Sequence, residues 1–140
     1  PGKAVEALQA ALKLDQQIAG GAGEYHKQLS QKLANAYFVK GVDAMQSRRM
    51  PEAYQSFRSA QKYDSNLPKV QERLADLAKE AKKLYEESYV IKATNQDLAI
   101  SKLKVAIQIV PPDDIYYNKA KKLLGTLTGE GGGSDDGDGF

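Results

Sequence analysis

Apolar side chains recur every three or four residues along most of the chain, the spacing that places them on one face of an α-helix. Groups of Gly, Pro, Asn and Asp interrupt this pattern where helices are expected to end. No stretch of useful length alternates apolar and polar residues, so the sequence predicts an all-α protein without strands. Six helices are expected, over residues 1–19, 24–46, 51–63, 68 to about 93, 96–109 and 115–127.

Four helix ends carry specific signals. Pro51 suits the first turn of a helix, where the missing N–H is not needed. Asn95 is expected to cap the helix that follows it, and Pro111 is expected to stop that helix. Asp113 and Asp114 then provide acidic caps for the last helix.

Three of the predicted helices carry the same residue types at the same offsets, which indicates an internal repeat. Small residues alternate with large apolar ones along one face, so a neighbouring helix can approach closely and interlock. The four aligned sets are Ala4, Ala53 and Ala99; Leu8, Phe57 and Leu103; Ala11, Ala60 and Ala106; and Leu14, Tyr63 and Ile109.

The most regular unit of this series resembles the tetratricopeptide repeat, a helix-turn-helix module whose stacked copies form an α-solenoid. The residues that carry the resemblance are Tyr37, Gly41, Ala44, Ala53, Phe57 and Ala60. Ala44 is smaller than the aromatic residue usual at that place. The copies begin 49 and 46 residues apart, from Ala4 to Ala53 and on to Ala99, whereas the family's repeat has about 34. The excess falls mainly in the first helix of each pair, which would splay or deepen the groove.

The resemblance implies a binding role, because members of the family hold peptides in a groove lined by the first helices. In the second unit it points to Asn35, Phe38, Val42 and Met45. In the long helix, where the register is ambiguous by one residue, it points to Tyr85, Tyr89 and Lys92, and in the last helix to Asn118 and Lys122. The polar set that some members use to hold a terminal carboxylate is not matched, since Phe38 and Val42 replace polar groups. An apolar peptide or helix of a partner protein is therefore the expected ligand, with lysines at the rim of the groove.

Composition limits the alternatives. The chain is 41% hydrophobic and 27% charged, with no run near the ~20 apolar residues that span a bilayer. It has no cysteine, which excludes disulfides, thiolate metal sites and a cysteine nucleophile. It begins without an initiator Met or a signal-peptide pattern, as expected of a fragment or a processed product, and no compartment is indicated.

The sequence predicts one repeat domain over residues 1–128 and a disordered Gly/Asp-rich tail over 129–140. The formal charge of +2 combines four acids in the tail, −4, with +6 on residues 1–128. The tail is a candidate competitor within the molecule for ligands of the basic body. A further spacing, oxygen-bearing side chains at Ser134, Asp136 and Asp138 before Gly139, resembles half of a calcium loop and lacks its closing Glu.

Nothing in the sequence points to catalysis, so we expect no enzymatic activity, cofactor, metal or small-molecule substrate. His26 is the only histidine, and no nucleophile or acid stands near it at a catalytic spacing. The glycine-rich stretch 20–27 precedes a helix, but it lacks the GKS/T ending of a phosphate loop.

Two other functions stay open at this point. The stripe on the long helix has coiled-coil spacing, so the chain is a candidate oligomerisation element; its members are Leu74, Leu77, Ala81, Leu84, Ser88 and Ile91. Lysines of the second half could bind nucleic acid or another anionic polymer, but acids are interspersed and a solvated face is favoured. These lysines are Lys79, Lys82, Lys83, Lys92, Lys102, Lys104, Lys119, Lys121 and Lys122.

Overall fold

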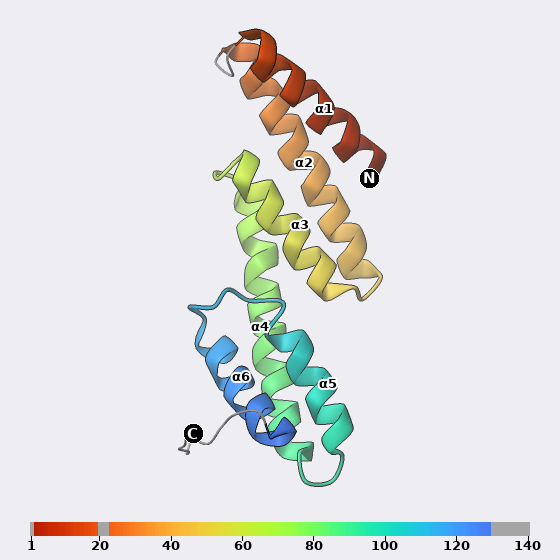
Figure 1. The fold of residues 1–140 in the computed structure, drawn as a ribbon, viewed down its shortest axis with the longest axis vertical. Helices are drawn as coiled ribbons and strands as arrows, with labels where there is room; N and C mark the ends of the chain where they lie inside the picture. Colours follow the sequence, from red (N-terminus) through yellow and green to blue (C-terminus); the bar gives the residue numbers. More distant parts are fainter. Residues whose placement is uncertain (1, 20–22, 130–140) are drawn as a thin grey trace. The chain divides into compact units, whose positions relative to one another are not determined.

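The computed structural model describes residues 2–19 and 23–129, and all regular structure within them is α-helical (Figure 1). The helices are α1 (Gly2–Ala19), α2 (Glu24–Gln46), α3 (Met50–Tyr63), α4 (Pro68–Ile91), α5 (Gln96–Ala106) and α6 (Ile115–Thr128). The predicted all-α class with six helices is confirmed, whereas their stacking as a tetratricopeptide-like solenoid stays a prediction. The predicted disorder of the tail and the calcium-like spacing lie beyond the described part of the chain.

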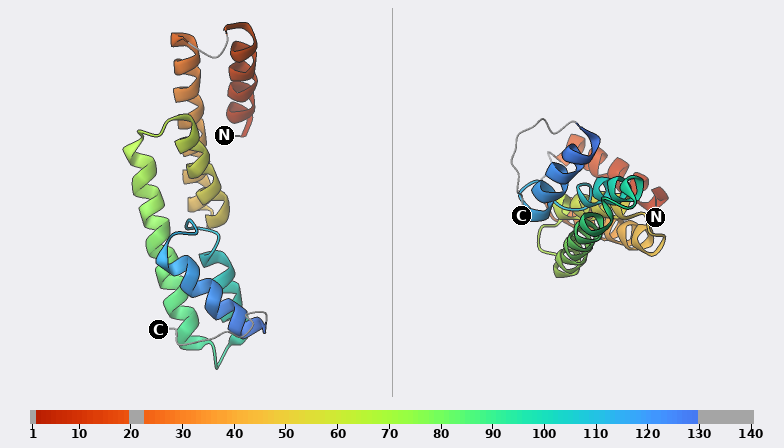
Figure 2. Two further views of the ribbon diagram at one scale, coloured as in Figure 1. Left: turned by 60° about the vertical axis from the view of Figure 1, so that its left-hand side comes forward. Right: turned by 90° about the horizontal axis from the view of Figure 1, so that it is seen from below.

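The chain divides into two compact units, Pro1–Arg73 and Leu74–Phe140, with the boundary inside α4. In unit 1, α1 lies beside the first half of α2, and α3 lies beside its second half (Figures 1 and 2). In unit 2, α5 and α6 pack against each other and against the C-terminal part of α4.

The helix ends follow the local signals closely, with one correction. Asn95 caps α5 by accepting a hydrogen bond from the Leu98 amide at 3.2 Å, as predicted. The predicted end of this helix at Ile109 is wrong, because α5 ends at Ala106. The amides of Gln108 and Ile109 bond to carbonyls three residues back, as Gln108 does to Val105 at 2.9 Å. Pro111 disfavours helical geometry at the residue before it, so the chain leaves the helix early.

One part of the core of unit 1 lies between α1 and α2. It contains Val5 and Leu12 of α1 and Leu29 and Leu33 of α2, all of them buried. Leu14, which the repeat assigns to the same face as Leu8, is 56% exposed. The first copy of the repeat therefore packs differently from the second and third, in which the aligned Ala, Phe or Leu, and Ala are fully buried.

The contact between α2 and α3 depends on one glycine. A Cβ added at Gly41 would lie only 2.5–2.9 Å from three ring carbons of Phe57. Phe57 is completely buried, and so are Ala53 and Ala60, one turn away on either side. The small residues predicted at the helix crossing thus leave room for the large ring.

In unit 2 a buried hydroxyl and an ion pair connect α4 to α5. The Ser88 hydroxyl donates to the Leu84 carbonyl at 2.7 Å and lies 3.2 Å from the Ala99 carbonyl oxygen of α5. Glu87 accepts a hydrogen bond from Lys102 at 2.9 Å, which lowers the pKa of the carboxyl.

The apolar stripe of α4, on which the oligomer hypothesis depends, already packs against other parts of the same chain. Its central members, Leu77, Ala81, Leu84 and Ser88, are all buried. A second copy could reach these side chains only if α4 separated from its neighbours. Self-association would therefore need another surface.

Candidate functional site

The residues predicted on α2 lie on one helix face, at spacings of three and four. Asn35 is exposed, and its amide donates to the Gln31 carbonyl of the preceding turn at 3.1 Å. Phe38, Val42 and Met45 are each half-buried. The three apolar members of this face are partly accessible, and a groove here stays a prediction.

Phe38 is engaged inside unit 1. Its ring lies 5.8 Å from the ring of Phe57, and the Lys69 ammonium lies 4.6 Å from its centroid. A ring held between a core aromatic residue and a lysine supports the packing of α2 whether or not it also touches a ligand.

The residues predicted on α4 lie in a cluster of tyrosine rings. The Tyr85 ring centroid is 6.4 Å from that of Tyr89 and 5.8 Å from that of Tyr116 on α6. Tyr85 is buried, with 7% of its surface exposed, whereas Tyr89 is 37% exposed. Tyr116 is half-buried. The inner ring thus fixes α4 against α6, and the outer ring reaches solvent.

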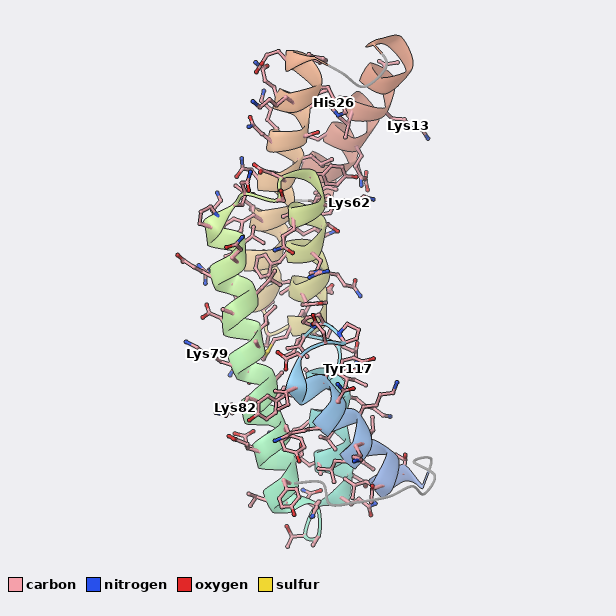
Figure 3. The ribbon with its side chains drawn as sticks, turned by 90° about the vertical axis from the view of Figure 1, so that its left-hand side faces the viewer. Lys13, His26, Lys62, Lys79, Lys82 and Tyr117 are labelled. Carbon is pink, nitrogen blue, oxygen red and sulfur yellow. The ribbon has the colours of Figure 1, made fainter. Side chains whose placement is uncertain are left out.

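Lysines lie over the two outer rings. The Lys92 ammonium is 3.6 Å from the Tyr89 ring centroid, and the Lys119 ammonium is 5.2 Å from the Tyr116 centroid. Both distances are within the range of a cation–π interaction. We call this set the tyrosine–lysine surface; it consists of Tyr85, Tyr89, Lys92, Tyr116 and Lys119. Figure 3 shows α4 and α6 of unit 2 with Lys82 and Tyr117 labelled on them.

The electrostatics of the inner ring favour its neutral form. Burial, and then the proximity of Tyr89 and Tyr116, raise the pKa of the Tyr85 hydroxyl above its ordinary value of 10.0. The phenol therefore stays protonated to a higher pH than an ordinary tyrosine and there keeps both its donor and its acceptor capacity.

The two predicted residues of α6 are exposed on its outer side. Asn118 and Lys122 lie one helical turn apart, in line with Ile115, which is 61% exposed. Lys119 is three residues from Lys122 and three from Tyr116, so it connects this line to the tyrosine–lysine surface. The structure therefore brings Tyr85, Tyr89 and Lys92 together, with Asn118 and Lys122 on an adjoining side of α6.

Tyr116 and Lys119 are the members of this surface that the sequence-based site omitted. A signal for Tyr116 existed, since it lies four residues before the buried Ala120 and so shares its face of α6. Nothing in the sequence indicated that this face meets Tyr85.

The other chemical candidates are His26 and the glycine-rich stretch. His26 is half-buried in the first turn of α2. Among the described residues no group of three His, Cys, Asp or Glu side chains is arranged to hold a metal ion. Residues 20–22 of the glycine-rich stretch lie outside the part of the chain that the structure describes.

A shallow hollow of about 200 Å³ lies at the turn between α2 and α3 in unit 1. Arg49 on its wall donates to Glu52 at 2.7 Å and lies 3.4 Å from an Asp43 oxygen. Two carboxylates therefore hold the guanidinium, so Arg49 is not directed at a ligand in this hollow. The hollow is lined by Gly2, Lys40, Asp43, Ala44, Arg49, Glu52 and Ser56.

Comparison with known proteins adds no relative. No protein-family model matches the chain, and neither the curated proteins nor the solved structures contain a match. In the described helices, none is both long and apolar enough to cross a membrane.

Proposed function

We propose that the chain is a non-catalytic interaction module that binds a peptide or helix of a partner protein. The observation that carries the proposal is the tyrosine–lysine surface of unit 2, where Tyr89 stays accessible above the buried Tyr85. Tyrosines are enriched in protein interfaces because a phenol offers a large apolar face and a polar tip at little entropic cost. Lysines beside such rings orient a ligand and raise its association rate.

The packing of unit 1 supports a repeat architecture of the tetratricopeptide type for this module. Gly41 of α2 leaves room for the buried Phe57 ring of α3, and Ala53 and Ala60 are buried one turn away on either side. These are the small and large residues that carry the resemblance to the family. In this proposal the helices serve as a rigid scaffold, and the side chains on their accessible faces determine the partner.

Site-specific crosslinking tests the proposal. A photoreactive phenylalanine analogue at Tyr89 replaces one aromatic side chain by another, and the same analogue at Gln55, exposed on α3, is the matched control. We expect irradiation in the native extract to join position 89, and not position 55, to one defined segment of a partner. Equal crosslinking at both positions, or none at position 89, would refute the proposed function.

A further inference from the structure

The rings of the tyrosine–lysine surface already contact one another and two lysines. Tyr85 contacts the rings of Tyr89 and Tyr116, and these two rings each have an ammonium group on one side. Such a surface presents ammonium groups beside partly accessible rings. A lysine held over a ring has lost part of its conformational freedom before any ligand arrives, so binding a carboxylate costs it less entropy.

The charge around these rings is positive on α6. Residues 115–128 contain Lys119, Lys121 and Lys122 and no acid. On α4, Lys82 is exposed three residues before Tyr85, one helical turn from the cluster. Glu86 is an exposed acid three residues before Tyr89, but the lysines around the rings outnumber it, so the surface is mainly complementary to carboxylates.

We infer that this surface binds a short acidic segment of a partner protein. Carboxylates of the segment meet the ammonium groups of Lys92 and Lys119, and an apolar or aromatic side chain between them packs on the edges of Tyr89 and Tyr116. This inference rests on the proposed function and adds the chemistry of the partner to it.

The same geometry disfavours a nucleic acid as the occupant. Single-stranded nucleic acids bind by stacking their bases on open aromatic faces. Here an ammonium group lies over the Tyr89 ring and another over the Tyr116 ring, so a base stacking on that side of either ring would have to displace a lysine. Glu86, exposed three residues before Tyr89, would also repel a continuous phosphate chain, whereas a peptide can leave a gap between its acids.

Fluorescence anisotropy with defined probes tests the inference on the full chain. The probe is a labelled peptide in which pairs of Glu alternate with Phe. Its Gln counterpart controls for charge, and a single-stranded oligo-dT controls for a polyanion. We expect the Glu peptide to bind at low salt, at least about tenfold more tightly than the Gln peptide and more tightly than oligo-dT.

Paired lysine substitutions localise the effect. Lys92→Gln with Lys119→Gln removes the two ring lysines, and Lys79→Gln with Lys104→Gln removes the same charge from exposed positions elsewhere on unit 2. We expect the first pair to weaken Glu-peptide binding about tenfold and the second less than about twofold. Circular dichroism confirms that both variants are folded.

Three results would overturn the inference: equal affinity for the Glu and Gln peptides, equal losses in the two lysine pairs, or tighter binding of oligo-dT. Crosslinking at position 89 separates these results from failure of the proposed function. A partner segment captured there without acidic residues overturns the acidic ligand alone, whereas absence of capture overturns the interaction module itself.

Discussion

Gly41→Ala is the sharpest test of the packing between α2 and α3. The added Cβ would lie 2.5, 2.7 and 2.9 Å from the Cε1, Cδ1 and Cζ atoms of Phe57. Favourable carbon contacts are about 3.5–4.0 Å long, so three contacts are short by roughly 1 Å. Phe57 is completely buried, so its ring cannot move aside into solvent. Overpacking a core costs about 1–3 kcal/mol, and three clashes place this case in the upper half of that range.

Helix propensity acts in the opposite direction. Replacing Gly by Ala inside a helix gains about 1 kcal/mol, so the expected net loss is about 1–2 kcal/mol. In a unit of this size such a loss lowers the midpoint of thermal unfolding by roughly 5–15 °C. Urea unfolding followed by circular dichroism measures the loss. The Gly2→Ala variant is the matched control, because nothing lies within 4 Å of the Cβ it would add.

A double-mutant cycle isolates the contact with the ring. In a Phe57→Leu background the aromatic carbons are absent, so Gly41→Ala should be neutral or stabilising there. A Gly41→Ala variant that is about 1 kcal/mol more stable than the parent chain would refute the close contact, because propensity alone would then explain the result. The same loss in both backgrounds would show that Phe57 is not the clashing group.

Four further predictions address other parts of the molecule. Arg48, just after the end of α2, has a left-handed backbone with φ 63°, which is strained for a residue with a side chain. Arg48→Gly should therefore stabilise the chain by about 0.5–1 kcal/mol in urea unfolding. A loss of stability would contradict this strain. Folding raises the pKa of Tyr85, so the unfolded state loses the proton first and the free energy of unfolding should fall as pH rises past 10. Tyr85→Phe should flatten this fall between pH 9 and 11. An unchanged slope would count against the buried phenol. The hydrogen bond from Lys102 lowers the pKa of Glu87. The stability that this pair contributes is therefore present above the ordinary pKa of 4.5 and disappears as pH falls through the lower folded value. Glu87→Gln should reduce the acid sensitivity of the urea midpoint, and an equally steep loss would show that the pair does not contribute. Deleting residues 130–140 removes four acids, so the affinity for the Glu peptide should rise at low salt, and an unchanged affinity would exclude the tail as a competitor.

The sequence was most informative where the cause of the structure is local. The bounds of α2 and the capping role of Asn95 follow from periodicity and from the chemistry of single residues, and the structure has both as predicted. The close approach at Gly41 was also predictable, because a small residue on one helix and a large one on its neighbour are complementary within one hairpin. The end of α5 was missed because Ile109 continues the apolar spacing, although the restriction imposed by Pro111 ends the helix sooner.

Contacts between distant segments could not be predicted in the same way. Tyr85 and Tyr116 are 31 positions apart (116 − 85), and no local pattern specifies that their helices meet. The spacing of α1 was equally ambiguous, since Leu14 and Leu12 both fit an apolar stripe and only Leu12 is buried. In each case the partner helix selects which of several apolar residues becomes the core.

The position of Phe38 changes how the predicted groove can be tested. The sequence places Phe38 and Val42 on a binding face, and a charge at either position is the direct way to block a ligand. Because the Phe38 ring contacts Phe57 and lies under Lys69, Phe38→Glu would place a carboxylate beside the core of unit 1. Loss of binding in that variant would then report unfolding as readily as a blocked groove. Lys92→Gln changes an accessible group that holds no helix in place, so its effect on binding can be attributed to the surface itself.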